Sequence, residues 1–345
     1  MAAVPKQMRA VQIKGGKGPS SSLYIAPDVA VPEAGADDVL VKVAVFGLNR
    51  MDLLQREGAY PVPPGASPIM GVEFSGHVVA SPGGHFTPGD AVFGLATGGA
   101  YAEYITCPAR MVLAKPDALS HEQAAAIPEN FLTAYQALHR LAEMREGETV
   151  LVHAGASGVG LAAIQLARLL GAKRIFVTAG SADKCAFCEK LGADAAINYK
   201  ETDWAAELAK QTDGRGVDVI MDFIGAGYFN QNLASLARDG RLVLQGMMGG
   251  TQVKDVNIGQ LLLKRLRVEG STLRSRDIEY QSSLVQDFVH SGNLDRLAEG
   301  VGREKTDDDV HHIVIHKVFS WNDIKGAHDE MAANKNTGKI VVTVD

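Results

Sequence analysis

The chain has 345 residues, of which 46% are hydrophobic and 21% charged, and its formal net charge is -6 at pH 7. The length exceeds that of one ordinary hydrophobic core and predicts two domains, while the composition excludes disordered and fibrous proteins. Because the balance is acidic and no run of five or more Lys or Arg occurs, we expect no nucleic-acid partner.

The sequence contains no stretch of 18 apolar residues and no secretory leader pattern, so we expect a cytoplasmic protein with no membrane partner. Three cysteines in a chain of this length do not make a disulfide framework. Cys185 and Cys188 form a C-x-x-C pair within a helical pattern, and no second ligand pair accompanies them. We therefore expect reduced thiols there and no metal.

Short strands separated by turns are predicted in residues 1–126, at 39–45, 72–80, 90–95 and 100–107. Ser120 and Gln123 then form a capping box, which begins a helix and indicates a domain boundary near residue 127. The final apolar run at 339–344 predicts a strand that returns to the first domain.

Residues beyond 127 alternate apolar runs with helical patterns, the runs lying at 149–154, 174–179, 194–199, 217–224 and 241–246. Continuous Val, Ile and Leu runs are typical of parallel strands that helices cover on both faces, so the fold class is α/β. We predict one domain at 127–272 and a second from 1–126 with 273–345.

A glycine-rich turn, HAGASGVG at 153–160, follows the first of these strands and opens a helix. A turn without Cβ atoms lets the backbone approach a pyrophosphate, and the helix N-terminus presents free N–H donors to it. The alternative is a tight turn with glycines for steric reasons alone, but the surrounding βαβ pattern favours nucleotide binding. The cofactor residues predicted here are Gly155, Ser157, Gly158, Val159 and Gly160.

The end of the second parallel strand decides which nicotinamide cofactor is expected. An NAD enzyme carries Asp or Glu there to accept hydrogen bonds from the ribose 2′-hydroxyl, but this chain has Gly180. Ser181, Lys184 and Tyr199 offer hydroxyls and an ammonium to a 2′-phosphate instead. These residues predict NADPH, unless Lys184 is simply a solvated surface charge.

Several motifs in order carry a family resemblance: NRMD at 49–52, GVEFSG at 71–76, AGASGVG at 154–160, TAGSADK at 178–184 and GKIVV at 338–342. With them the chain resembles the zinc-independent quinone oxidoreductases of the medium-chain dehydrogenase/reductase superfamily. It is most similar to the tumour-suppressor-inducible group of animals, relatives of zeta-crystallin. This resemblance implies a GroES-like β-rich catalytic domain plus a Rossmann doubly wound parallel-sheet domain that binds NADPH.

The resemblance also implies that no metal is bound. Zinc alcohol dehydrogenases of the superfamily place a Cys and a His where this chain has Asn49 and Val72, and neither residue is a zinc ligand. A structural zinc lobe of four cysteines is impossible with three.

The resemblance further implies the residues of the reaction site, namely Tyr60, Asn49, Asp52 and Ser157. Tyr60 is the predicted hydrogen-bond donor to the acceptor, although a loop tyrosine that packs on the segment PVPP at 61–64 is the alternative. For the cofactor it implies Thr133, Gly246, Met247, Met248, Leu273, Arg274 and Ser275. The two methionines suit plain packing equally well.

Three histidines are given no catalytic role. His153 lies at the strand-to-turn junction and is expected to be structural, whereas His311 and His312 are expected at the surface.

The predicted activity is the NADPH-dependent reduction of a quinone, in one- or two-electron steps. A polarising hydrogen bond is sufficient for such an acceptor, because its reduced oxygen is a stabilised phenolate. The alternatives are reduction of an alkenal or enone double bond, which uses the same fold and cofactor, and a binding or structural role without turnover. A homodimer is expected through the strand at 265–271, which otherwise leaves a sheet edge open.

Overall fold

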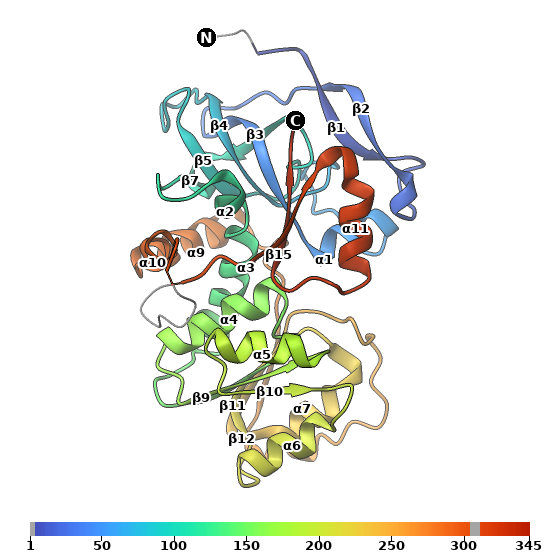
Figure 1. Cartoon of the computed structure of the whole chain (residues 1–345), viewed down its shortest axis with the longest axis vertical. Helices are drawn as coiled ribbons and strands as arrows, with labels where there is room; N and C mark the ends of the chain where they lie inside the picture. Colours follow the sequence, from blue (N-terminus) through green and yellow to red (C-terminus); the bar gives the residue numbers. More distant parts are fainter. Residues whose placement is uncertain (1–3, 304–310) are drawn as a thin grey trace. The chain divides into compact units, whose positions relative to one another are not determined.

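The computed structural model describes residues 4–303 and 311–345, which form two compact units (Figure 1). The first unit comprises residues up to Glu129 together with Arg274–Val301 and Ile313–Asp345, and the second comprises Asn130–Leu273 and the described parts of Gly302–His312. The divisions therefore fall after Glu129 and Leu273, where the sequence placed them after residues 126 and 272. The return of the chain to the second unit near His311 was not anticipated.

The first unit is built on a seven-stranded sheet. Along its main path the order is β14 (Ile315–Ser320), β15 (Lys339–Thr343), β3 (Asp38–Leu48), β4 (Glu73–Ala80), β5 (Ala91–Leu95) and β7 (Val112–Ala114), and β6 (Tyr104–Pro108) also pairs with β3. A separate ribbon joins β1 (Gln7–Ile13) to β2 (Leu23–Ala30). The predicted return of the C-terminal strand is confirmed, because β15 pairs with β3.

Apolar residues close the core of this sheet, in which Phe46, Phe74 and Phe93 are fully buried. β3 and β4 approach so closely at Gly76 that any Cβ there would collide with the backbone of Lys42. The α-helices that lie wholly in the described part of this unit are α1 (Arg50–Glu57), α2 (His121–Ala125), α9 (Ile278–His290), α10 (Asn293–Glu299) and α11 (Ile324–Ala332). The predicted capping box is confirmed, since the Ser120 side chain accepts from the Gln123 N–H and Gln123 reaches back.

The second unit is a six-stranded parallel sheet in the order β10 (Ala195–Asn198), β9 (Arg174–Ala179), β8 (Thr149–Val152), β11 (Val217–Asp222), β12 (Leu236–Leu244) and β13 (Arg267–Gly270). Numbered along the chain this order is 3-2-1-4-5-6, that of the Rossmann fold. The strand order reverses between β8 and β11, and ligands of such sheets bind at the carboxyl ends of the strands beside that point.

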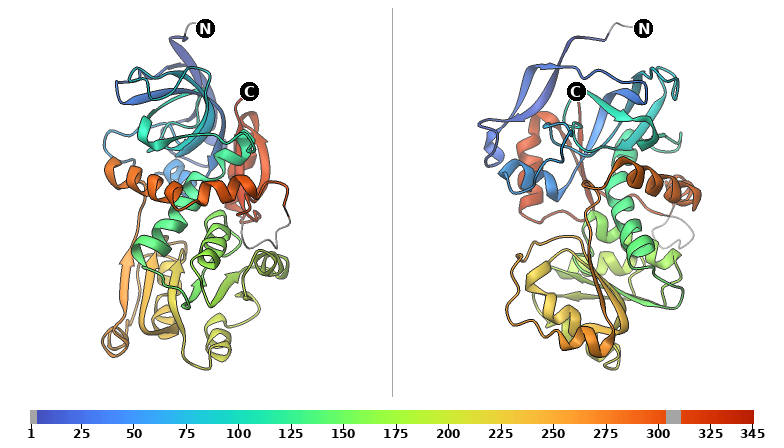
Figure 2. Two further views of the ribbon diagram at one scale, coloured as in Figure 1. Left: turned by 90° about the vertical axis from the view of Figure 1, so that its left-hand side faces the viewer. Right: turned by 180° about the vertical axis from the view of Figure 1, so that it is seen from behind.

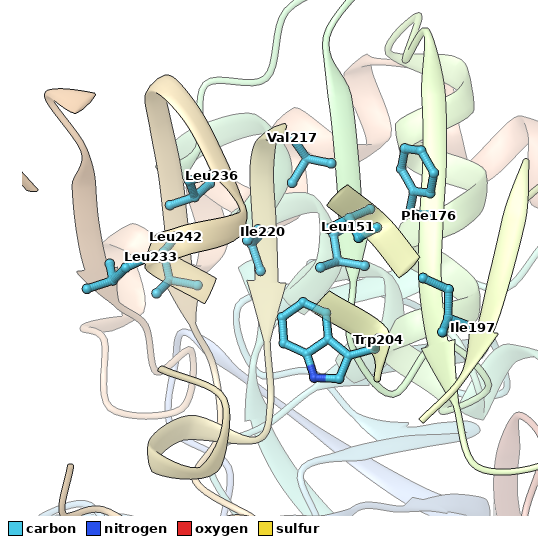
Figure 3. Packing of buried hydrophobic residues seen from close by; sticks show 10 residues of the cluster. Leu151, Phe176, Ile197, Trp204, Val217, Ile220, Leu233, Leu236 and Leu242 are labelled. Carbon is cyan, nitrogen blue, oxygen red and sulfur yellow. The ribbon is translucent and has the colours of Figure 1, made fainter. Parts of the chain in front are cut away.

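Helices cover both faces of this sheet (Figure 2). α4 (Gly158–Leu169) and α5 (Ala182–Lys190) pack against β8, β9 and β10 on one face. On the other face α6 (Trp204–Gln211) and α7 (Phe229–Ser235) enclose a cluster that includes Leu151, Ile220 and Trp204 (Figure 3). Burial of this cluster stabilises the packing of the sheet against these helices. It thereby fixes the position of the turns at the carboxyl ends of the strands.

Two smaller features complete the fold. Cys185 and Cys188 lie within α5 as free, buried thiols, and burial raises the pKa of Cys188 to about 12, which disfavours the reactive thiolate. Among the helices of the described residues, none is long and apolar enough to cross a membrane.

Candidate functional site

The turns that follow the parallel strands of the second unit carry most of the predicted cofactor residues. The glycine-rich turn follows β8, Gly180 follows β9, Tyr199 follows β10, and Gly246 lies two residues after β12. Because the carboxyl ends of parallel strands lie at one edge of the sheet, these turns share that edge (Figure 1).

The glycine-rich turn is tight for steric reasons and also presents a helix N-terminus. A Cβ on Gly155 would lie 2.7 Å from the Val177 side chain, and one on Gly160 would lie 2.5 Å from the Ala154 carbonyl oxygen. Ser157 is the N-cap of α4, its Oγ accepting from the Gly160 N–H at 3.0 Å. The first helical N–H groups, at Gly158 and Val159, have no acceptor within the helix, so the turn offers donors to an anion.

In the turn after β9 the Tyr199 side chain occupies the place that a carboxylate side chain would take. A Cβ on Gly180 would lie 2.9 Å from the Tyr199 hydroxyl, so Asp or Glu at this position would displace that side chain. Ser181 caps α5 by accepting from the Lys184 N–H at 3.3 Å, which places the lysine in the first turn of the helix. Ser181, the backbone of Lys184 and the Tyr199 hydroxyl therefore lie around one turn.

A fully buried polar chain lies beneath these turns. His153, after β8, bonds through Nδ1 to Thr178 Oγ1 at 2.9 Å and through Nε2 to Asn232 Oδ1 at 2.8 Å. Asn232 in turn donates to Asp222 Oδ2 at 3.0 Å. Burial lowers the pKa of His153 to about 4, so the ring is neutral and serves a structural role, as the sequence indicated.

Asp222 holds the loop that follows β11. Its carboxylate accepts from the Ile224 N–H at 2.6 Å and the Gly225 N–H at 3.1 Å. That loop pairs with the one that carries the predicted methionines, because the Met248 N–H donates to the Phe223 carbonyl at 3.1 Å. Met247 and Met248 are exposed, so plain core packing does not account for them.

One buried polar atom at this edge is unsatisfied. Gln245 donates through Nε2 to the Thr133 carbonyl at 3.1 Å, but its Oε1 is buried without a partner among the described residues. Since an amide oxygen is an acceptor, it suits the carboxamide N–H of a nicotinamide. The glycine turn, the hydroxyl-lined turn and this orphan acceptor all fit a nicotinamide dinucleotide phosphate.

In the first unit Asn49 bonds to both members of a buried ion pair, Glu73 and Lys339. Its Nδ2 donates to Glu73 Oε1 at 2.7 Å and its Oδ1 accepts from Lys339 Nζ at 2.6 Å, while Lys339 and Glu73 contact each other directly. All three side chains are buried, and so is Val72. The cation beside Asn49 is thus the Lys339 ammonium group of the chain itself. The Asn49 amide and the Val72 side chain do not form a donor set for zinc. No group of three or more His, Cys, Asp or Glu that suits a metal exists among the described residues.

Asp52 ends a second buried chain. Arg56 donates to His328 Nδ1 at 3.1 Å, His328 Nε2 contacts the Tyr101 hydroxyl at 3.3 Å, and Tyr101 contacts Asp52 Oδ2 at 3.2 Å. Asp52 also accepts from the Asn49 N–H at 2.8 Å, which completes the capping box of α1. Its Oδ1 has no partner in the part of the chain that the structure describes, and burial raises the pKa of Asp52 to about 6.

Tyr60 lies two residues beyond the left-handed Gly58 that ends α1. The guanidinium carbon of Arg274 lies 5.6 Å from the centre of its ring. Arg274 donates to the Thr97 carbonyl at 2.8 Å and to Gln55 Oε1 at 2.7 Å, so its side chain belongs to the first unit. Leu273 falls in the second unit and Ser275 in the first, so the predicted cofactor segment 273–275 is split where the units meet along the chain.

The expectation that His311 and His312 lie at the surface is wrong. Their exposed fractions are 2% and 7%. His312 exchanges backbone hydrogen bonds with the Gln165 side chain of α4, and His311 lies against Phe131 with ring centres 5.8 Å apart. Their position in a polar sequence suggested exposure, but the chain returns there to pack on the second unit.

Two family models match the chain. The alcohol dehydrogenase GroES-like domain matches residues 35–117, and the zinc-binding dehydrogenase model matches residues 158–288. The two matches agree with a β-rich first unit and a Rossmann second unit.

Curated relatives decide the family. Human quinone oxidoreductase is 33% identical over 282 residues, which cover 80% of this chain and 83% of the human protein. The chain belongs to the quinone oxidoreductase branch of the medium-chain dehydrogenase/reductase superfamily. A polyketide synthase subunit of Mycobacterium tuberculosis is 30% identical over 316 residues, 89% of this chain, but the match spans only 14% of the synthase.

Solved structures of two kinds of oxidoreductase are similar to this chain. Escherichia coli quinone oxidoreductase, solved with NADPH, has a TM-score of 0.83 and 29% identity, and covers 98% of this chain and 100% of its own. The CurK enoyl reductase has a TM-score of 0.82 and 30% identity with the same coverage. The fold and the oxidoreductase class are shared, and the acceptor is what differs between these neighbours.

Several residues of these clusters were missed from the sequence. Glu73 and Lys339 stand in two quoted motifs, so their buried pairing was open to inference, although they are far apart in the chain. Nothing in the sequence marks His328 or Gln55, because each acquires its role from a tertiary contact.

Asp52 gives a prediction about pH. A buried carboxyl whose pKa is raised from 3.8 to about 6 favours its neutral form in the folded state, so stability falls as pH rises from about 4 to 6 and then levels off. Asp52→Asn removes this penalty, and we expect it to raise the free energy of unfolding at pH 8 by about 1–3 kcal/mol and to have little effect near pH 4. Urea unfolding at both pH values measures this.

The matched control for that experiment is Asp28→Asn, which alters an exposed carboxylate. It should leave the unfolding free energy unchanged at both pH values. An Asp52→Asn protein that is less stable than the parent at pH 8 would show that the ionised carboxylate stabilises the fold.

Proposed function

We propose that this protein is a zinc-independent NADPH:quinone oxidoreductase. The proposal rests on two sites that each contain a buried polar atom without a hydrogen-bond partner among the described residues, one for a nicotinamide cofactor and one around Tyr60. An Asn49–Lys339–Glu73 cluster stands in place of metal ligands. The named quinone oxidoreductases of human and Escherichia coli support the acceptor class, and the latter was solved with NADPH.

The reaction suits residues that act without a Lewis acid. When bound, NADPH supplies a hydride to the acceptor, which takes up a proton to give the reduced product. Gly155 to Gly160 and the turn after β9 hold the phosphates, while Gln245 and the exposed methionines orient the nicotinamide end. Tyr60 and its neighbours in the first unit supply donors to the oxygen on which charge develops.

Reduction of an activated double bond is the second candidate, and the likeness to the CurK enoyl reductase favours it specifically. Both reactions start from the same cofactor and leave charge on an oxygen, so the protein distinguishes them through the shape of the acceptor site.

The test is a panel of acceptors under saturating NADPH. Initial rates with phenanthrenequinone, benzoquinone and 3-buten-2-one are compared by following loss of NADPH absorbance. We expect kcat/KM for at least one quinone to exceed that for the enone by tenfold or more. The reverse order would assign a double-bond reductase, and tight NADPH binding without turnover of any acceptor would favour a binding role.

NADPH preference generates a prediction at Lys184. Lys184→Ala should raise Kd for NADPH by about 10- to 100-fold, the range for loss of a charge-assisted contact, and leave Kd for NADH nearly unchanged. Nucleotide fluorescence titration measures both constants.

Lys190→Ala provides the control, because it removes a lysine from the exposed end of the same helix. This variant should bind both nucleotides normally. Equal losses for NADPH and NADH in Lys184→Ala would mean that the lysine does not contact the 2′-phosphate.

We also propose a homodimer formed through the edge of the parallel sheet. β13 is the outer strand, and the adjoining helix α8 (Gly259–Lys264) exposes Leu262 and Leu263 with 79% and 74% of their surface accessible. Antiparallel pairing of two β13 strands about Val268 places Arg267 opposite Glu269 of the other copy, a favourable charge pair. Adjacent exposed apolar side chains beside an open sheet edge are typical of an interface.

The double variant Leu262→Glu/Leu263→Glu should sediment as a monomer at micromolar concentration, whereas the parent sediments as a dimer, because four carboxylates repel and hydrate the interface. Leu54→Glu, on the exposed side of α1 in the first unit, is the control and should remain dimeric. A parent protein that is itself monomeric would contradict the assignment.

We further propose a cytoplasmic location, a small-molecule acceptor as the substrate, and no nucleic-acid or membrane partner. We also propose catalytic roles for Tyr60, Asn49, Asp52 and Ser157.

A further inference from the structure

The first unit contains a buried cation with an unused donor. Arg274 is 3% exposed, and of its three nitrogens Nε donates to the Thr97 carbonyl and Nη1 to Gln55 Oε1. Nη2 is buried and has no hydrogen-bond partner in the structure as described. Burial of an unpaired N–H of a charged group is costly, so an atom of this kind calls for an explanation, and an absent ligand is one of the few available.

The guanidinium is held in place by its other two bonds. Gln55 lies in α1, and its own amide donates to the Pro68 carbonyl at 3.3 Å, which fixes the orientation of the acceptor that Nη1 uses. Thr97 precedes Gly98, and Nη2 lies so near this glycine that a Cβ on it would be 3.4 Å away, within van der Waals contact. A planar group fixed at two points directs its third nitrogen without further loss of side-chain entropy.

The surroundings of Arg274 identify the ligand. The partly exposed Tyr60 ring lies over the guanidinium, and the charge of Arg274 acts on both Tyr60 and Asp52, where it lowers the pKa against the larger opposing effect of burial. Within its unit Arg274 is therefore the cation beside the predicted donor to the acceptor. A cationic N–H beside the ring of a tyrosine suits an oxygen that becomes negative during reduction.

We propose that Arg274 is a catalytic residue of the acceptor site, whose Nη2 donates to the acceptor oxygen as that oxygen becomes an oxyanion. The sequence resemblance had assigned Arg274 to the cofactor; the hydrogen bonds to Gln55 and Thr97 place it with Tyr60 instead. The inference rests on the proposed function, in which a hydride from NADPH reduces the acceptor ring, the oxygen takes the electron pair released from its C=O bond, and a proton from solvent completes the product.

The approach of the acceptor has a structural requirement. Nη2 is shielded from solvent, and the Tyr60 ring beside the guanidinium is partly exposed. Because Nη2 is buried, an acceptor oxygen reaches it only if a neighbouring side chain moves, and the Tyr60 ring is one such neighbour. An oxygen that arrives there forms a charge-assisted hydrogen bond in the absence of competing water.

The test uses anion binding as well as turnover. 4-Nitrophenolate resembles the reduced oxyanion and 4-nitroanisole is its neutral counterpart, and both are titrated into the cofactor-free protein at pH 8.5. We expect the parent to prefer the anion and Arg274→Met to weaken anion binding at least tenfold without changing that of the neutral probe. With quinone, kcat should fall by about 10²- to 10³-fold while Kd for NADPH stays within twofold.

Three further variants keep the outcome interpretable. Arg276→Met removes the same charge two positions along, where the side chain is exposed and lies over Tyr280 at 4.7 Å, and it should behave like the parent. If Arg274→Met does not fold, Arg274→Lys keeps the charge without the fork, and a three- to tenfold loss of anion affinity is expected. Tyr60→Phe should lose less activity than Arg274→Met because the cation remains.

The results separate this inference from the proposed function. Unchanged anion binding in both Arg274 variants, or a loss of NADPH affinity as large as the loss of activity, would overturn the role of Arg274 and leave the quinone reductase standing. A parent protein that reduces no acceptor but binds 4-nitrophenolate through Arg274 would remove the proposed reaction and preserve the anion site.

Discussion

The turns at the carboxyl ends of the parallel strands in the second unit depend on the buried carboxylate of Asp222 for their position. It accepts two backbone N–H groups of the loop after β11 and the amide of Asn232, which in turn fixes His153 below the glycine turn. Strands β8, β9 and β11 are thus joined at their carboxyl ends by side chains and not only by the sheet. Burial raises the pKa of Asp222 to about 6, so at neutral pH these hydrogen bonds are made by an ion that the fold would otherwise disfavour.

The first unit also contains hydrogen-bonded buried charged groups, but some of their polar atoms have no partner among the described residues. Asp222 is provided with donors on both oxygens, whereas Asp52 has an unpaired Oδ1 and Arg274 an unpaired Nη2. His328, like His153, is buried and neutral, and burial lowers its pKa to about 3, so it relays a hydrogen bond without adding charge. An absent ligand is one explanation for an unsatisfied buried group, and both of these groups lie in the unit that contains Tyr60.

The sequence predicted the parallel sheet well because its central strands β8, β9 and β11 are largely apolar runs, and β9 has the predicted bounds of 174–179. α1 was missed because its polar face and short length give little periodicity directly after a long strand. The glycine turn was found from local spacing, but the Arg274–Gln55 bond joins residues 219 positions apart, which no local pattern reveals. The burial of His312 has the same origin, since its partner Gln165 is 147 positions away.

The absence of metal ligands at Asn49 and Val72 narrows the acceptors that the first unit can serve. Reduction of a simple ketone leaves an alkoxide, a strong base that calls for a Lewis acid or immediate protonation. Reduction of a quinone leaves a phenolate, whose conjugate acid ionises near pH 10 as in tyrosine, so its charge is already spread over a ring. A planar guanidinium is more weakly hydrated than an ammonium and stacks on aromatic faces, which suits a delocalised oxyanion better than a localised one. The fixed Arg274 beside the Tyr60 ring, with Lys339 committed to Glu73, is therefore a better match for a conjugated acceptor than for an isolated carbonyl.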